Sequence, residues 1–196
     1  MLIIFIRQLC KLCFVITLAC LRDAIVVTQC VTSRDTIGRL VYDCSDVYLG
    51  RFPEVGDTTF NTSVLKLRNT GLTYVPPLAL QGLTQLQYLD ISRNDIRRFE
   101  NDTFANISSL LYLDIRANTV LAAMAALPAG LFSDLSRLET LKINGDRINI
   151  SRMQEFIKET SVFQLSLKVL HVQNGTLQPS VTLARRFPGL TYLEFH

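Results

Sequence analysis

The sequence predicts a solenoid of the α/β class, in which short strands stack side by side instead of folding into a globule. Residues 86–96 read Leu-x-x-Leu-x-Ile-x-x-Asn-x-Ile, with an aliphatic residue or Asn at every fixed position. The same pattern returns from Leu110 to Val120, 24 residues after its first appearance at Leu86. A pattern that recurs every 20–29 residues or so is typical of stacked coils, because one unit alone cannot bury its apolar side.

Weaker copies extend this register along the chain. If the first leucine is position 1, the copies begin at Thr62, Leu86, Leu110, Leu138, Leu167 and Leu190. Positions 4 and 6 alternate with polar residues, which is the period-two signature of a half-buried strand. The spacing is that of a leucine-rich repeat, so we expect a right-handed horseshoe with a parallel sheet on its concave face. The expected strands are Val64–Arg68, Tyr88–Ser92, Tyr112–Arg116, Thr140–Asn144, Val169–Gln173 and Tyr192–Phe195.

Position 9 governs the turn that follows each strand. Asn94 and Asn118 occupy it in two copies, where an inward-facing amide would bond backbone groups that the turn leaves unpaired. Thr70, Asp146 and Gly175 occupy it in others. We expect looser, hydrated turns in those three copies.

The side opposite the strands is expected to be filled by aromatic residues. Phe99, Phe104 and Phe132 are interpreted as core residues that widen this side and make the horseshoe curve. Ser151–Thr160 is predicted to form a helix on the same side, with Ser151 as its N-cap.

Residues 1–24 are predicted to be a secretory signal peptide. Arg7 and Lys11 give a positive start, residues 12–21 an apolar segment, and Thr17-Leu18-Ala19 a small-residue cleavage motif. One alternative is a membrane anchor, but a span needs about 20 uninterrupted apolar residues, and the two cations interrupt this one. Another is a bacterial lipoprotein site at Cys20, which Thr17 disfavours because Leu is expected there.

Removal of that segment leaves Cys30 and Cys44 as an even pair in an oxidising compartment, where a disulfide is expected. Cys10 and Cys13 have the spacing of a metal or redox pair, but they lie in the segment that is removed. More Asn-x-Ser/Thr sequons are present than the composition alone would give, which predicts a glycosylated ectodomain. The sequons begin at Asn61, Asn101, Asn106, Asn149 and Asn174.

The stretch from Cys30 through Cys44 and Leu49 to Pro53 resembles the amino-terminal cap of extracellular leucine-rich-repeat proteins. In that cap a disulfide-held strand covers the first coil, which would otherwise expose core leucines and unpaired strand groups. Residues 86–107 resemble the repeat with a convex Phe that is common in Toll-like receptor ectodomains. The expected organisation is a signal peptide at 1–24, a cysteine cap at 25–61, and about five and a half repeats at 62–196. The chain ends in mid-repeat at His196, as expected for a fragment.

The resemblance implies the ligand-binding ectodomain of an innate immune pattern-recognition receptor of the Toll-like class, in its amino-terminal part. It also implies a protein or glycan ligand, a receptor homo- or heterodimer, and a secreted or plasma-membrane location, with an endosomal one less favoured. Membrane attachment would come only from a region beyond this sequence. The alternative is a secreted or adhesion-type leucine-rich-repeat matrix protein with no signalling function.

The concave face carries the candidate binding residues, since Tyr and Arg are favoured where interfaces bind tightly. The alternative is a solvated polar face on which two carboxylates repel each other mildly. The candidates are Tyr88, Asp90, Tyr112, Asp114, Arg116, Lys142 and His171.

We expect no enzymatic activity, cofactor or metal, because the chain has 2 histidines and no ligand-spaced cluster or phosphate loop. The net charge of +3 is modest, and no run of Lys and Arg predicts a nucleic-acid partner.

Overall fold

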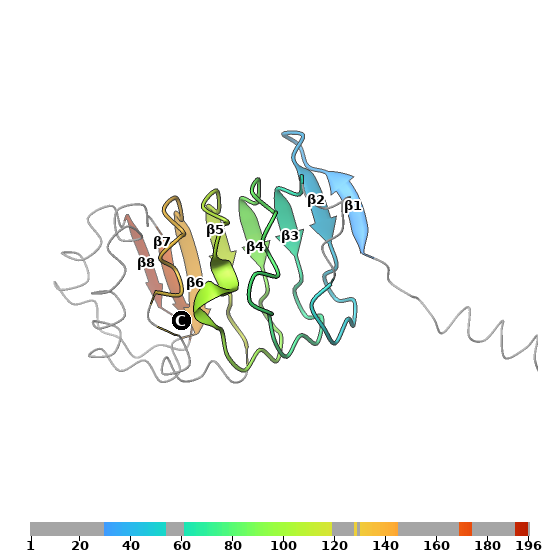
Figure 1. Ribbon diagram of the computed structural model, residues 1–196. Coiled ribbons are helices and arrows are strands. Elements are labelled where there is room, and N and C mark those ends of the chain that lie inside the picture. Colours follow the sequence, from blue (N-terminus) through green and yellow to red (C-terminus); the bar gives the residue numbers. More distant parts are fainter. Residues whose placement is uncertain are drawn as a thin grey trace, which may run out of the picture.

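The computed structural model describes residues 30–53, 61–118, 128, 130–144, 169–173 and 191–195. In these ranges the chain forms a leucine-rich-repeat solenoid, whose strands make one sheet in sequence order from β1 to β8 (Figure 1). A single 3₁₀ helix, η1 (Asn101–Phe104), is the one helical element of the described residues. The strands are β1 (Val31–Arg34), β2 (Leu40–Asp43), β3 (Val64–Lys66), β4 (Tyr88–Asp90), β5 (Tyr112–Asp114), β6 (Thr140–Asn144), β7 (Val169–Gln173) and β8 (Tyr192–Phe195).

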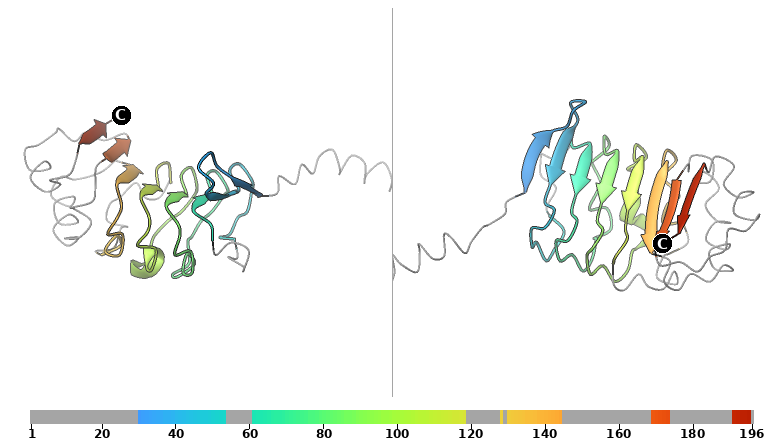
Figure 2. Two further views of the ribbon diagram at one scale, coloured as in Figure 1. Left: turned by 90° about the horizontal axis from the view of Figure 1, so that it is seen from above. Right: turned by 180° about the vertical axis from the view of Figure 1, so that it is seen from behind.

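The strands pair in the register that the repeat predicts. β1 and β2 form an antiparallel hairpin, and each later strand joins its predecessor in parallel. Leu89 is paired with Leu65 on one side and Leu113 on the other, so position 4 meets position 4 in successive coils. The sheet lines one side of the molecule and η1 lies on the opposite side (Figure 2). The predicted parallel, in-register sheet is therefore confirmed.

Three strands end earlier than predicted, whereas β6, β7 and β8 have the predicted bounds. In β4, the Asp90 carboxylate accepts a hydrogen bond from the Ser92 backbone N–H at 2.9 Å. In β5, Asp114 accepts the equivalent bond from the Arg116 N–H at 3.1 Å. A carboxylate bonded to the backbone two residues ahead favours a turn over an extended strand. β6 has Lys142 at this position and stays extended, while β3 ends level with β4, its partner.

The interior is filled by the aliphatic positions of the repeat. Leu86, Leu89 and Ile91 are fully buried, and one continuous core extends from the first coil to β6. On the side opposite the sheet, the ring of Phe104 lies 5.3 Å from that of Phe99 and 5.9 Å from that of Phe132, measured between centroids. The three phenylalanines are core residues, as the sequence predicts.

Position 9 satisfies the turns through the side-chain amide of Asn94. Its Oδ1 accepts hydrogen bonds from the backbone N–H groups of Thr70 and Leu72, at 2.8 and 3.1 Å. Its Nδ2 donates to the carbonyl oxygens of Leu67 and Ile91, at 2.7 and 2.9 Å. One amide therefore serves two successive coils, its own and the one before it.

The expectation of a loose turn at Thr70 is wrong. Thr70 is fully buried, and its hydroxyl donates a 3.0 Å hydrogen bond to the Leu67 carbonyl oxygen. The turn is compact because Asn94 reaches back from the next coil to bond the backbone there. Asp146 and Gly175, expected to behave in the same way, lie outside the described residues.

A disulfide and a hairpin close the amino-terminal end. Cys30 is bonded to Cys44, which confirms the predicted pair, and Cys44 is fully buried in the core beside Phe52. β2 supplies the neighbouring strand that the first coil would otherwise lack. An open coil end would expose apolar side chains and unpaired backbone groups, so this arrangement protects both.

Two predicted segments, the signal peptide at 1–24 and the helix at 151–160, fall outside the described residues, and the domain boundaries remain predictions. Within the described ranges, the structure contains no helix with the length and apolarity needed to cross a membrane.

Candidate binding surface

A stack of side chains from three neighbouring strands forms the centre of the concave face. Tyr88 on β4 and Tyr112 on β5 are paired in register, with ring centroids 4.2 Å apart and planes 6° from parallel. The Lys142 ammonium, from β6, lies 5.3 Å from the Tyr112 ring centroid. These side chains point away from the core, because the intervening Leu89 and Leu113 point into it. The rings are thus held by the sheet before any ligand arrives.

Both phenols remain protonated at physiological pH. Burial raises the pKa of Tyr112 well above its usual value, and the nearby charge of Asp114 raises it further. Burial also raises the pKa of Tyr88, which is half-buried in the stack. The Tyr112 hydroxyl donates a long hydrogen bond of 3.5 Å to Asp114 Oδ2. The two rings therefore offer neutral aromatic surface with hydroxyl donors at its edge.

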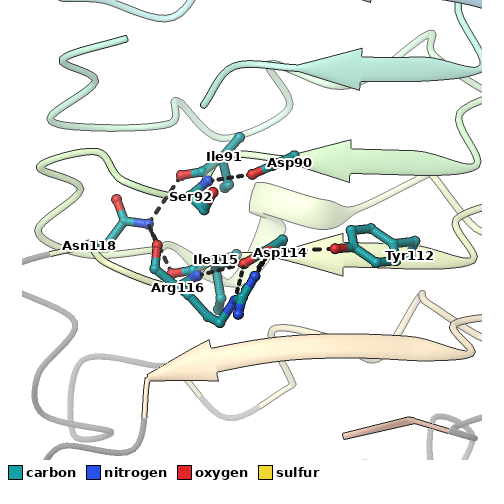
Figure 3. Close-up of polar contacts among 8 residues, drawn as sticks. All are labelled: Asp90, Ile91, Ser92, Tyr112, Asp114, Ile115, Arg116 and Asn118. Atoms are coloured by element: carbon teal, nitrogen blue, oxygen red, sulfur yellow. Dashed lines mark hydrogen bonds and ion pairs between the residues drawn. The ribbon is translucent and has the colours of Figure 1, made fainter. Parts of the chain in front are cut away.

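The two neighbouring carboxylates of this face have different surroundings (Figure 3). Arg116 binds Asp114 through two nitrogens, with Nε 3.0 Å from Oδ1 and Nη2 2.7 Å from Oδ2. That hydrogen bonding raises the pKa of Arg116, so the guanidinium stays charged. Asp90 is also buried, at 8% exposure, but makes no ion pair with any described residue. Arg116 thus offsets the repulsion that we expect between the adjacent carboxylates.

These groups lie along a groove of about 430 Å³ that runs over β3 to β6. Four cationic and two carboxylate side chains line it, together with the tyrosine pair. The lining residues are Arg68, Tyr88, Asp90, Ser92, Arg93, Tyr112, Asp114, Arg116, Ala117 and Lys142.

Six of the seven predicted binding residues come together in this groove; the side chain of the seventh, His171, lies outside what the structure describes. Arg68 and Ser92, at position 7, also line it, although they were not among the seven. Neither Arg93 nor Ala117 was predicted. Both occupy position 8, with left-handed φ values of 56° and 53°. The repeat pattern specifies no residue type at position 8, and neither Arg nor Ala marks a left-handed backbone, so no sequence signal identified them.

The described sequons are on the surface. Asn61, Asn101 and Asn106 are exposed. Asn101 begins η1, on the side of the solenoid away from the sheet (Figure 2). Glycans at this helix would leave the groove uncovered. Asn149 and Asn174 lie outside the described residues, and glycosylation itself remains a prediction.

Comparison with known proteins supports the repeat fold. Residues 60–120 match the family described as leucine rich repeat. No curated protein sequence matches the chain significantly. Among solved structures, the chain is similar to human 5T4 (Wnt-activated inhibitory factor 1, trophoblast glycoprotein), with a TM-score of 0.65 and 18% sequence identity. The similarity covers 86% of this chain and 62% of that one.

The chain therefore spans less than two thirds of the length of that solved structure. At this level of identity the likeness extends to the fold and not to the partners. Neither reported match is to a Toll-like receptor, so that narrower resemblance is not supported by the comparisons.

Proposed function

We propose that the chain is the ligand-binding part of an extracellular leucine-rich-repeat ectodomain, and that the groove over β3 to β6 binds a protein partner. The observation that carries this proposal is the stack of Tyr88, Tyr112 and Lys142 beside the Asp114–Arg116 pair. The few residues that contribute most of the binding energy in protein interfaces are enriched in Trp, Tyr and Arg. Since the sheet already orders these side chains, they would lose little conformational entropy when a partner binds.

The proposed chemistry is recognition and not catalysis. The concave surface of a repeat solenoid is an extended platform that suits binding of a large partner. In the groove, the charged groups of Asp114 and Arg116 neutralise each other, and the phenols stay protonated. Such groups anchor a ligand through contacts and hydrogen bonds.

We further propose an extracellular location. The Cys30–Cys44 disulfide fits an oxidising compartment. The exposed sequons and the similarity to a glycoprotein structure support the same placement. Expression of the whole chain in animal cells tests it: we expect secretion, cleavage of the signal peptide after a residue from Ala19 to Ala24, and a mass that falls on glycosidase treatment. An uncleaved, intracellular product would contradict the proposal.

Within this class we propose the amino-terminal part of a Toll-like innate immune receptor that recognises microbial or host ligands as a dimer. The 24-residue spacing of Leu86 and Leu110, with the buried convex ring of Phe104, supports it. The alternative, a secreted or adhesion-type protein with no signalling function, is favoured by the similarity to trophoblast glycoprotein. The transcript beyond the His196 codon separates the two. A membrane span followed by a cytoplasmic signalling domain supports the receptor, whereas a cysteine cap followed by a stop codon supports the alternative.

Binding through the groove is tested with the whole chain fused to an antibody Fc region and screened against a panel of purified secreted and cell-surface proteins. Tyr112→Ala removes half of the tyrosine stack, and Lys142→Ala removes the cation above it. We expect each substitution to weaken a captured partner, Tyr112→Ala by roughly tenfold or more.

The matched control is Tyr74→Ala, which removes another tyrosine in a cation–π contact, with the Arg98 guanidinium 5.6 Å from the ring centroid. Tyr74 lies outside the groove, so its substitution should leave binding unchanged. Thermal unfolding of each variant shows whether the fold is retained. The proposal is wrong if every captured partner binds the two groove variants as tightly as the wild-type chain.

A further inference from the structure

Cationic side chains outnumber carboxylates in the groove, and this excess indicates the chemistry of the partner. Its lining includes Arg68, Arg93, Arg116 and Lys142 but only two carboxylates. Arg116 is held against Asp114 by a bidentate ion pair and is 25% exposed, so it is not available to pair with a ligand in the same way. The remaining three cations form no ion pair with a described residue.

These three cations are accessible from the solvent side of the sheet. Arg68 and Arg93 are exposed, follow the carboxyl ends of β3 and β4, and line the groove together with Ser92. Lys142 is partly exposed above the Tyr112 ring. An arginine guanidinium recognises a carboxylate with two parallel hydrogen bonds, which gives direction as well as attraction. The groove thus presents carboxylate-binding groups on both sides of the tyrosine stack.

We propose that the partner presents an acidic peptide segment, whose carboxylates pair with Arg68, Arg93 and Lys142 while its backbone lies across Tyr88 and Tyr112. This inference rests on the proposed protein-binding function of the groove. Charge complementarity identifies the occupant: a positive groove attracts an anionic segment and disfavours a basic one.

Asp90 sets a limit on where the acidic groups of the segment can lie. Its carboxylate is buried, accepts a hydrogen bond from the Ser92 N–H, and makes no ion pair with a described residue. A ligand carboxylate directly over Asp90 would be repelled, so the segment's acidic side chains must lie to either side of it. The repulsion makes Asp90 a selectivity group, and its removal should strengthen the binding of a uniformly acidic peptide.

The test uses the whole secreted chain and a fluorescent peptide of about ten residues that alternates Glu and Gly. Peptides with Lys or Gln in place of Glu serve as comparisons, and binding is followed by fluorescence anisotropy at low and physiological salt. We expect the Glu peptide to bind best and to weaken with salt, because exposed charge pairs are screened.

Opposite responses at two neighbouring positions make the test specific. Arg93→Gln should weaken the Glu peptide about 1.5- to 5-fold, the range for one exposed charge pair. Asp90→Asn should strengthen it by a similar factor, and the Asn oxygen can still accept the Ser92 N–H, so the fold is retained. Arg97→Gln removes the same charge from an exposed residue outside the groove and should change nothing.

Equal weakening by Arg93→Gln and Arg97→Gln, weaker binding by Asp90→Asn, or a preference for the Lys peptide overturns the inference. A size-matched heparin fragment that binds more tightly than the Glu peptide, through the same residues, also overturns it, because the groove would then serve a sulfated glycan. A protein partner that depends on Tyr112 but ignores Arg93→Gln overturns this inference alone. Insensitivity of every ligand to Tyr112→Ala overturns the proposed function itself.

Discussion

The amino-terminal end differs from the second and third coils in how its core is covered and its turn is hydrogen-bonded. Each must cover apolar side chains and satisfy the backbone polar groups of a tight turn. In the coils that begin at Leu86 and Leu110, a buried Asn at position 9 bonds the turn, and the neighbouring coils cover the core. At the amino-terminal end, a disulfide and an antiparallel hairpin cover the core, and the first turn is bonded from the next coil.

The comparison shows that a coil can lack Asn at position 9 if the next coil has it. Thr70 occupies the position of Asn94 one coil earlier, yet it is fully buried and its turn is compact because Asn94 serves both coils. The first turn of the solenoid therefore needs the Asn94 amide of the second coil, and we expect the second coil to need the amino-terminal end less. Substitutions in the two regions should reveal this asymmetry in the free energy of unfolding.

The largest effect is expected from Asn94→Ala. It would remove the hydrogen-bond acceptor of the Thr70 and Leu72 N–H groups. The Leu67 and Ile91 carbonyl oxygens would each lose one donor but keep another, the Thr70 hydroxyl and the Asn118 amide. Because each unsatisfied buried group costs about 1–3 kcal/mol, we expect a loss of roughly 3–5 kcal/mol in the free energy of unfolding. Urea unfolding followed by circular dichroism measures it.

The control for this substitution is Gln85→Ala, at an exposed position just before the second coil. Its unfolding midpoint should remain near that of the wild type. If Asn94→Ala had an equally small effect, the turns would not depend on the amide, and water would have to satisfy them.

A somewhat smaller effect is expected from opening the amino-terminal end with Cys30→Ser and Cys44→Ala together. The bond joins residues 14 apart in sequence, and disulfides of this loop length stabilise by about 2–4 kcal/mol. Urea unfolding measures the loss, and the wild-type chain in reducing buffer should show a similar midpoint. A double variant as stable as the oxidised wild type would show that the hairpin alone closes the end.

A change in the opposite direction is expected from Thr62→Val. Thr62 stands where the later coils have Leu, is 1% exposed, and its hydroxyl has no hydrogen-bond partner among the described residues. Replacing the hydroxyl by a methyl group removes an unsatisfied polar atom, so we expect a gain of about 1 kcal/mol. The substitution leaves the Asn61 sequon intact, since Ser63 supplies its hydroxyl.

Thr70→Val is the matched control for Thr62→Val. Thr70 is just as buried, but its hydroxyl is bonded to Leu67. The same chemical change should therefore destabilise at position 70 and stabilise at position 62, as judged by the thermal midpoints. Two shifts of the same sign would mean that side-chain hydrogen bonding does not distinguish the sites.

The smallest effect is expected at acidic pH, from Asp43 in the cap. Burial opposes ionisation there, but hydrogen bonds from Ser45 and Lys66 outweigh it and hold the pKa of Asp43 below its usual 3.8. A lowered folded-state pKa stabilises the fold above pH 3.8, and this stabilisation is lost as the pH falls through the folded-state value. Asp43→Asn should therefore flatten the acid limb of a stability–pH curve. An unchanged slope would place the acid sensitivity elsewhere.

The sequence by itself determined the repeat, the strand order and the inward-facing residues. Leu89, Leu113 and Leu141 could be assigned to one interior because a period of two within a strand, repeated from coil to coil, leaves a single face to bury. The Cys30–Cys44 bond followed from an even cysteine count. The side-by-side placement of Tyr88 and Tyr112 can be read from the sequence as well, since register aligns position 3 of one coil with position 3 of the next.

Only the tertiary structure decided how the polar groups are partnered. The contact between the Lys142 ammonium and the Tyr112 ring joins two coils, and no pattern within either coil predicts it. The Thr70 turn is bonded by Asn94, which belongs to the next coil. Arg93 lines the groove from a position with a left-handed backbone. Which apolar side chains are buried follows from the periodic pattern within one segment. Which polar groups are partners depends on distances between segments, and only folding brings those segments together.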